Sequence, residues 1–440
     1  MATRHRWARN LAALAAAFAG GAFAAQPSHA TTGAASPYAP LDQLGRVLVF
    51  VENHYVDAVE RDKLVEGAIH GMVAELDPHS AYMDPKEYAA FTEETEGTFA
   101  GIGVEVDYRD DAVTVIAPIA GSPAERAGLR SGDQILAVDD KPLHGLPVDK
   151  IVELMRGKPK SHVALAVKRP GQTTLLRFDL VRENIHVPSV EGKRLRGDVA
   201  YLRLKQFQTG THEELLQAVA TLQGGGEALR GVLLDIRNNP GGLVDEAEAV
   251  ADEFLAGGEI YSTRHRGQIL EEARAHPGGA LTRLPTVLLV NEYSASSAEL
   301  LAGALQDNGR AQVVGTRTFG KGSVQTIFEL PGGAGMRLTT MRYYTPSGRA
   351  IQAAGILPDV GLEYAPDDAM PFGVLREDSL EGHLAPEQAQ PERARKVLKA
   401  GSRPKLGSIA EVPIDPKSSA DFALKVGYEE LERAMREGGG

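Results

Sequence analysis

A serine and a lysine lie 25 residues apart in glycine-rich chain and could together break an amide bond. Ser296 lies between an apolar run, Thr286–Val290, and a run with helical spacing, 298–306. This pattern predicts a hydroxyl at a helix N-terminus, where unpaired N–H groups can stabilise an oxyanion. The hydroxyl needs a base before it can attack a carbonyl carbon. Lys321 can be that base only if burial lowers its pKa.

Lysine is an unusual base because its ordinary pKa, about 10.4, keeps it protonated at pH 7. Lowering that pKa by about 3 units costs roughly 4 kcal/mol, which the surrounding fold must supply. Taken alone, the pair has a plainer interpretation, in which Ser294, Ser296 or Ser297 caps the helix. Lys321 is then a solvated loop residue. Ser294 also competes with Ser296 as the nucleophile.

The composition indicates a globular protein of more than one domain. The chain has 440 residues, 43% of them hydrophobic, and a formal net charge of −12. No long run of Lys or Arg is present, so we exclude nucleic acid as a partner. There is no cysteine, which excludes disulfides and thiolate chemistry. No metal-binding motif such as His-Glu-x-x-His occurs, so we predict that the protein uses no metal or other cofactor.

The first 30 residues have the features of a cleavable signal peptide. Arg4, Arg6 and Arg9 form a basic region, and an apolar stretch follows it. This stretch has only 15 residues, whereas a spanning helix needs about 20 apolar residues. Small residues permit cleavage after Ala24 or Ala30. We therefore predict export, to the periplasm or an equivalent compartment, and consider an uncleaved membrane anchor the weaker interpretation.

Residue patterns divide the rest of the chain into five regions. Apolar residues at helical spacing predict helices in 41–96 and again in 417–440. Short alternating runs with two short helical ones predict a small β-rich module in 97–184. Strand and helix patterns alternate through 185–365, which predicts an α/β core. Segment 366–416 is rich in Pro, Glu, Asp and Ala, and we expect a mobile linker there.

Several segments occur in an informative order. They are Leu76-Asp-Pro-His-Ser80, a PDZ signature that begins at Gly101, Asp235-Ile-Arg-Asn-Asn-Pro-Gly-Gly242, the Ser296 segment, Gly320-Lys-Gly-Ser-Val-Gln325, and Tyr344-Thr-Pro-Ser-Gly348 with Gly355-Ile-Leu-Pro-Asp359. On these segments the chain resembles the carboxyl-terminal processing peptidases, also called tail-specific proteases. The resemblance implies an α/β protease core of crotonase- and Clp-protease-like strand–turn–helix units, with an inserted β-rich PDZ domain and helical N- and C-terminal segments.

The resemblance also implies an exported serine endopeptidase that cleaves protein C-terminal regions with a Ser/Lys dyad. Ser296 is then the nucleophile, Lys321 the general base and Gln325 the residue that orients the lysine. If the chain is extended there, the side chains of Lys321 and Gln325 face one way, and the Gln325 carbonyl can hold the amine.

The Asn-Pro-Gly-Gly turn that ends at Gly242 is first of all a strand-to-helix turn. The resemblance implies that the N–H of Gly241 or Gly242, which the sequence does not separate, joins the Ser297 N–H in an oxyanion hole. Loss of one such donor typically costs about 10²–10³ in rate. The family more usually has the reverse order where this chain has Ser297-Ala298, and this departure leaves Ser296 in place.

Four residues match the carboxylate-binding loop of PDZ domains: Gly101, Ile102, Gly103 and Val104. The amides of such a loop can form a nest for a terminal carboxylate. The resemblance therefore implies protein or peptide substrates with free, apolar C-termini, which the PDZ domain selects. By association with the family we expect envelope proteins among them, an activating adaptor, and homo-oligomers built through the terminal helices.

Two other functions remain open. The first is a non-catalytic PDZ adaptor on a protease-like fold, and the joint presence of Ser296, Lys321 and Gln325 argues against it. The second is a Ser-His-Asp hydrolase, since folding could bring one of the twelve histidines to Ser296. For His79, in the Asp-Pro-His-Ser turn, we expect a structural role.

Overall fold

The computed structural model describes residues 38–109, 112–224, 226–365, 375–387 and 396–437. The chain divides into two compact units, Met1–Gly71 and Met72–Gly440. Helix α2 spans Ala39–His54 in the first unit, and α3, Arg61–Ala74, begins there and ends in the second. No helix in these described ranges is both long enough and apolar enough to cross a membrane. The predicted signal peptide lies outside the described residues.

The second unit contains a seven-stranded sheet. Its strands follow the order β10 (Val190–Leu195), β11 (Val199–Leu204), β12 (Gly231–Asp235), β15 (Thr286–Val290), β16 (Ala311–Gly315), β19 (Val360–Glu363) and β20 (Lys396–Lys399). Neighbouring strands are parallel except for β10 and β11. Every residue of β11, β12 and β15 is buried, as expected for parallel strands that are covered on both faces.

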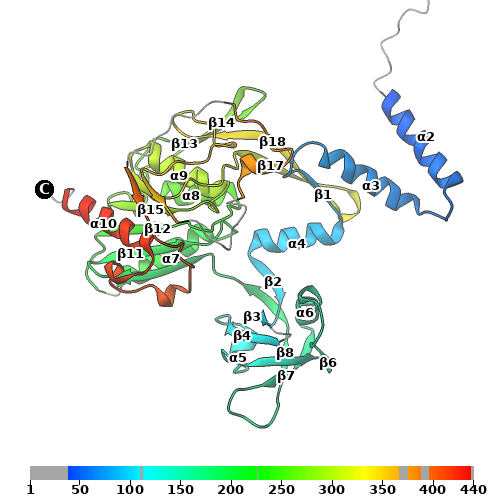
Figure 1. Ribbon diagram of the computed structural model, residues 1–440, viewed down its shortest axis with the longest axis horizontal. Coiled ribbons are helices and arrows are strands. Elements are labelled where there is room, and N and C mark those ends of the chain that lie inside the picture. Colours follow the sequence, from blue (N-terminus) through cyan, green and yellow to red (C-terminus); the bar gives the residue numbers. More distant parts are fainter. Residues whose placement is uncertain (1–37, 110–111, 225, 366–374, 388–395, 438–440) are drawn as a thin grey trace, which may run out of the picture. The chain divides into compact units, whose positions relative to one another are not determined.

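Helices cover both faces of this sheet (Figure 1). One face carries α7 (Thr211–Gly224), α8 (Val244–Asp252) and α9 (Ser297–Asp307), and the other carries α10 (Phe422–Glu437). Side chains of β11 alternate between the two layers: Ala200 and Leu202 pack with α7–α9, whereas Val199 and Tyr201 pack with α10. The α/β core that the alternating patterns predict is therefore present.

A second sheet packs on α8 and α9 through β13. It consists of β1 (Ala81–Met83), β18 (Gly335–Tyr344), β13 (Glu259–His265) and β14 (Gln268–Arg274), and β17 (Ser323–Glu329) also pairs with β18. The short helix η1 (Pro331–Gly333) lies in the β17–β18 turn. Strand β1 occurs where the sequence predicts only helices, because its pairing with β18 is long-range and leaves no local signal. Helix α4 (Pro85–Glu96) follows it and is capped by Asp84.

Residues 98–186 form the expected β-rich module. Its main sheet has the order β3 (Val104–Arg109), β4 (Ala112–Pro118), β5 (Gln134–Val138), β7 (His162–Lys168) and β8 (Leu176–Val181), with β6 (Lys141–Pro142) on β5. Strands β2 (Thr98–Gly101) and β9 (Glu183–His186) pair where the chain enters and leaves, and the helices are α5 (Pro123–Arg126) and α6 (Val148–Met155). Strand β3 is an edge strand, since among the described strands it pairs only with β4.

Where the structure describes it, segment 366–416 is not the mobile linker that its composition predicts. It contains η2 (Glu377–Ser379), β20 and η3 (Ile409–Glu411), and η4 (Pro416–Ser418) begins at its end. Glu377 is buried and pairs with His79, while β20 extends the main sheet. These partners are distant in the sequence, so local composition could not indicate them. Residues 366–374 and 388–395 lie outside the described residues.

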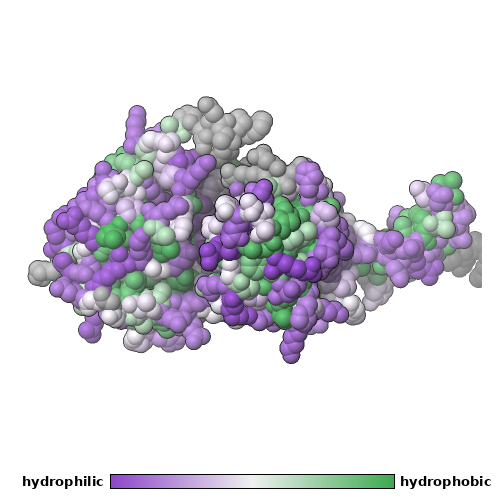
Figure 2. Space-filling view, turned by 90° about the horizontal axis from the view of Figure 1, so that it is seen from below, coloured by the Kyte–Doolittle hydropathy of each residue, from purple (hydrophilic) through white to green (hydrophobic). Residues whose placement is uncertain are grey.

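Hydrophilic residues predominate on the face seen in Figure 2, with smaller apolar areas among them. This surface agrees with the net charge of −12 and the absence of a basic run in the sequence. A solvated acidic surface accounts for the charge without a charged partner.

Candidate active site

Three loops that leave adjacent parallel strands carry the predicted site residues. The Gly241-Gly242 pair follows β12, Ser296 follows β15, and Lys321 follows β16. Because the carboxyl ends of parallel strands meet at one edge of a sheet, the three loops converge. Together with α4, β17 and β18 they line a cavity of about 330 Å³.

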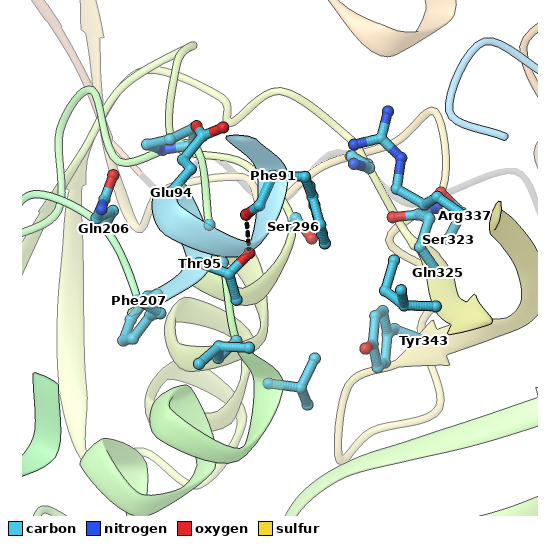
Figure 3. Close-up of a pocket in the computed structure, with 17 residues that line it drawn as sticks. Phe91, Glu94, Thr95, Gln206, Phe207, Ser296, Ser323, Gln325, Arg337 and Tyr343 are labelled. Carbon is cyan, nitrogen blue, oxygen red and sulfur yellow. Dashed lines mark hydrogen bonds between the residues drawn. The ribbon is translucent and has the colours of Figure 1, made fainter. Parts of the chain in front are cut away.

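Ser296 occupies a strained turn at the start of α9. Its φ of 56° and ψ of −122° lie in a region that L-residues avoid. The Glu299 N–H donates to the Ser296 carbonyl oxygen over 2.7 Å, which closes the turn. Gly241 lies so near that a Cβ at its position would be 2.8 Å from the Ser296 Cβ. The site therefore requires a glycine beside the serine, and the Ser296 side chain lines the cavity (Figure 3).

The two glycines after β12 differ in their hydrogen bonds. The Gly241 N–H donates to Asn239 Oδ1 over 2.9 Å. Gly242 forms a parallel bridge with Phe207, in which Phe207 bonds to the residues on either side of Gly242. In such a bridge the N–H of the middle residue points away from the partner strand. Within the described part of the chain, the N–H groups of Gly242 and Ser297 donate to no acceptor.

Glu299 holds the serine and lysine loops together. Its buried carboxylate accepts hydrogen bonds from the backbone N–H groups of Ser296 (2.9 Å), Gly320 (2.8 Å) and Lys321 (2.9 Å). It also accepts one from Thr318 Oγ1 at 2.5 Å. Burial raises the pKa of Glu299 to about 7, although these donors oppose the shift. Glu299 was not among the site residues predicted from the sequence. Its signal there is an acid three positions after the serine that precedes the helix.

Lys321 is largely withdrawn from solvent and lines the cavity. Burial lowers the pKa of its amine below the ordinary value, because desolvation disfavours the charged form. The positive charge of Arg337, which lines the same cavity, acts in the same direction. The carboxylates of Glu377, Asp77 and Glu299 act in the opposite direction but do not outweigh burial. Arg337 was not among the site residues predicted from the sequence.

Gln325 lies in β17 and lines the cavity with Lys321. Its Nε2 donates to Ser323 Oγ over 2.8 Å and to Thr339 Oγ1 over 3.3 Å. The pairing of β17 with β18 shifts register between Val324 and Gln325, so the condition of a regular extended chain, under which the sequence places both side chains on one side, is not met. Both side chains nevertheless reach the same cavity.

The cavity walls combine apolar and aromatic side chains with polar and charged ones. Figure 3 shows Ser323, Gln325, Arg337 and Tyr343 on one side of the cavity and Gln206 and Phe207 on the other. Helix α4 contributes Phe91, Glu94 and Thr95, and the Thr95 hydroxyl donates to the Phe91 carbonyl oxygen over 2.8 Å. The site therefore combines one hydroxyl, one amine of lowered pKa and free backbone donors in a cavity that also offers apolar surface.

Other predicted residues lie outside this cavity. Ser294 is buried, and its hydroxyl donates to the Ile236 carbonyl oxygen over 2.8 Å, so it is committed to a turn. None of the described residues that line the cavity is a histidine. The loop from Gly101 to Val104 lies in the β-rich module, and Gly103 has a φ of 72° with Ser122 packed against it. That φ is one that glycine adopts without strain.

Comparisons with known families agree with this arrangement. The family description "Peptidase family S41" matches residues 198–362, which include Ser296 and Lys321. A PDZ domain description matches residues 114–169. A third description, "Activating protease CtpB N-terminal domain", matches residues 17–87.

Individual proteins are similar over most of the chain. A carboxy-terminal-processing protease of Bartonella bacilliformis is 40% identical over 399 residues, which cover 90% of this chain and 88% of that protein. A probable CtpA-like serine protease of Staphylococcus aureus is 39% identical over 329 residues, which cover 74% of this chain and 65% of that protein. Among solved structures, a photosystem II D1 C-terminal processing protease is 31% identical, with a TM-score of 0.44, over 73% of this chain and 92% of that one.

Proposed function

The chain belongs to the carboxy-terminal-processing serine proteases of peptidase family S41, and on that premise we propose that Ser296 is its nucleophile and Lys321 its general base. One observation carries the proposal: a hydroxyl and an amine of lowered pKa line the same cavity. A neutral amine can accept the serine proton, whereas a protonated one cannot. The strained conformation of Ser296 further supports a functional role, since such strain gathers at active sites.

In the proposed reaction, Ser296 Oγ attacks the carbonyl carbon of the scissile amide while its proton passes to Lys321 Nζ. The oxyanion accepts hydrogen bonds from the N–H groups of Gly242 and Ser297, which are free among the described residues, whereas the Gly241 N–H is not. As the intermediate collapses, the C–N bond breaks and the Lys321 ammonium returns the proton to the leaving amine. Lys321 then takes a proton from water, whose oxygen attacks the acyl ester. The bond between the acyl carbon and Ser296 Oγ breaks, and the Lys321 ammonium returns the proton to that oxygen.

Gln325 is the proposed partner that orients Lys321. Its amide nitrogen already donates to Ser323 and Thr339, which supports leaving its oxygen for the amine. One neutral acceptor can fix the direction of the Lys321 amine. Unlike a carboxylate, it does not form an ion pair that would favour the charged form of the lysine.

The dyad is tested by cleavage of an unfolded reporter protein with an apolar C-terminus. Ser296→Ala and Lys321→Ala should each lower kcat by at least about a thousandfold. Ser296→Ala should keep the wild-type thermal unfolding midpoint, and Lys321→Ala should not lower it, because the cost of burying the amine is removed. Lys321→Arg keeps the charge but cannot act as a base, so it should be equally inactive. Lys205→Ala, at a partly exposed lysine that does not line the cavity, is the control and should keep the wild-type rate. Turnover in Lys321→Ala would contradict the dyad and favour the Ser-His-Asp mechanism. No turnover by the wild type would favour the adaptor.

The PDZ domain is the proposed reader of the substrate tail. Strand β3 has an open edge, which supports pairing with an extended peptide, and the loop from Gly101 to Val104 begins that strand. The reporter with a free C-terminus should be cleaved faster than the same reporter with an amidated one. Equal rates would count against carboxylate reading, although they would leave the dyad untouched.

Export, self-association and action on envelope proteins or with an activating adaptor are further proposals. Helix α2 exposes large apolar side chains, including Leu44 and Phe50, which supports self-association. Sedimentation of Phe50→Glu beside the wild type tests this, and an identical oligomeric state would contradict it. The repeated strand–turn–helix units at β12–α8 and β15–α9 support the proposed crotonase- and Clp-protease-like core.

A further inference from the structure

The turn that carries Asp77 lies against the candidate active site from outside the protease core. Asp77 is only 6% exposed. Its Oδ1 accepts hydrogen bonds from the N–H groups of His79 (2.9 Å) and Ser80 (3.0 Å) and from Thr339 Oγ1 (3.1 Å). Its Oδ2 accepts one from Ser80 Oγ at 2.8 Å. Burial tends to raise the pKa of Asp77, but these donors outweigh it and hold the pKa below its usual range. The carboxylate is therefore an acceptor only.

Because the Asp77 carboxylate can only accept, it determines which group donates in each hydrogen bond between Asp77 and Gln325. The Ser80 hydroxyl donates to Asp77, so its lone pairs accept the Thr339 N–H over 3.1 Å. The Thr339 hydroxyl also donates to Asp77, so only its lone pairs face Gln325. Gln325 must then present its NH₂ group to Thr339, at 3.3 Å, and turn its carbonyl oxygen elsewhere. Ser323 Oγ accepts from the same NH₂ group, which agrees with this orientation.

A second chain of hydrogen bonds leads from the same turn to the backbone beside Lys321. His79 Nε2 lies 2.7 Å from Glu377 Oε2, and Gln352 Nε2 donates to Glu377 Oε1 over 2.7 Å. Gln352 Oε1 in turn accepts the Gly322 N–H over 3.0 Å. The turn is thus connected to the segment from Gly322 to Gln325 by two routes, which hold the backbone after Lys321 and the amide of Gln325.

We propose that Asp77 is a positioning residue of this protease, which acts through Thr339 to hold the Gln325 amide with its oxygen available to Lys321. The proposal rests on the proposed function of Lys321 as the base. The alternative is a purely structural role, in which Asp77 only holds the segment after α3 against β18. A residue with that role would affect stability and activity whether or not Gln325 is present, whereas a positioning residue affects activity only through Gln325.

The decisive experiment is therefore a double-mutant cycle between Asp77 and Gln325, with kcat and KM measured on the reporter used for the dyad. Asp77→Ala, which removes the oxygen that accepts from Thr339, should lower kcat about tenfold, the effect of one net hydrogen bond, and leave KM unchanged. Gln325→Ala should do the same. In the Gln325→Ala background, Asp77→Ala should add less than about twofold, because the amide that it orients is gone. Multiplicative losses would overturn the proposal.

A second series keeps the test decisive if Asp77→Ala does not fold. Thr339→Val removes the relaying hydroxyl but leaves the turn intact, and it should reproduce the tenfold loss of kcat and the same non-additivity with Gln325→Ala. Thr339→Ser keeps the hydroxyl and should restore the rate. Thr340→Val is the matched control, because that neighbouring hydroxyl pairs with Thr326 and not with Gln325. Equal losses in Thr339→Val and Thr340→Val would refute the relay.

These experiments distinguish an error in the Ser296/Lys321 dyad from an error in the positioning role of Asp77. If Lys321→Ala keeps its activity, the dyad is wrong, and the positioning role is withdrawn with it. If Lys321→Ala is inactive but the effects of Asp77→Ala and Gln325→Ala multiply, the dyad stands and only the positioning role is wrong.

Discussion

Replacing Ser296 by glycine should leave the protein more stable than replacing it by alanine, which reverses the usual order of these two residues. The Ser296 backbone has a φ of 56° and a ψ of −122°. An L-residue held in such a region costs about 1–3 kcal/mol, and glycine adopts it without that cost. Glycine loses about 0.5–1 kcal/mol more than alanine in chain entropy on folding. The difference favours glycine by about 1 kcal/mol, within a range of about 0–2.5 kcal/mol.

Urea unfolding of Ser296→Ala and Ser296→Gly measures this difference directly. Both variants lack the nucleophilic oxygen, so self-cleavage does not disturb either measurement. Ala298→Gly is the control, because Ala298 is two residues further on and inside α9. There the same change of residue should destabilise the protein by about 1 kcal/mol. If Ser296→Gly is no more stable than Ser296→Ala, the strain argument is refuted.

Three further predictions concern charged groups. Arg337→Met should move the acidic limb of the kcat/KM profile to higher pH, since Arg337 lowers the pKa of Lys321; an unmoved limb would contradict this. The wild type should lose about 3 kcal/mol of stability relative to Glu299→Gln between pH 4.5 and about 7. The sign follows because native Glu299, with a raised pKa, keeps a proton in this window that the unfolded chain has released. Urea unfolding of both proteins at pH 5 and pH 8 measures this difference in stability. Equal pH dependences of the wild type and Glu299→Gln would contradict the prediction. Asp235→Ala should cost about 3–5 kcal/mol, also measured with urea, because it leaves the buried Arg237 guanidinium undercompensated; a loss below 1 kcal/mol would be inconsistent with that.

The position of Ser296 could be predicted because it lies in a turn between a continuously apolar strand and a helix, whereas that of Lys321 depended on its motif. A strand, a turn and a helix in succession leave a strong local signal, and the ordered motifs added the rest. What the sequence does not encode locally is the order of the strands. Strand β15 lies between β12 and β16 in the sheet, and only this order makes the three loops neighbours. Gly241 and Gly242 could not be separated either, because their difference depends on the bridge between Gly242 and Phe207.

The contacts around β18 could not be predicted from the sequence. Arg337 and Thr339 lie in a hairpin strand without a site motif, and they reach the site because β18 pairs with β17 on one side and β1 on the other. Glu377 lies in a segment whose composition predicts a linker, yet it is buried. Glu299 is the exception, since its spacing from Ser296 was a readable helix-start signal. It was overlooked because a capping role does not by itself indicate a site.

The electrostatics of Lys321 explain why the neighbouring acids do not abolish a lysine base. Asp77, Glu299 and Glu377 each favour its charged form, yet the pKa of Lys321 is lowered because burial outweighs them and Arg337 adds to the effect. Among the described residues none forms an ion pair with the Lys321 amine. The oxygens of the three acids accept hydrogen bonds from other donors instead.

This arrangement separates two requirements that conflict. A direct ion pair would stabilise the Lys321 ammonium in the resting enzyme and remove the base. A site without any negative charge would make the ammonium formed during the reaction costly in a buried place. Acids that lie near the amine lower the cost of forming the ammonium during the reaction. Because other donors occupy their oxygens, these acids do not pair directly with the amine in the resting enzyme. The hydrogen bonds that occupy Glu299 and Asp77 would therefore help the proposed base to stay neutral, and those of Glu299 also hold the Lys321 loop in place.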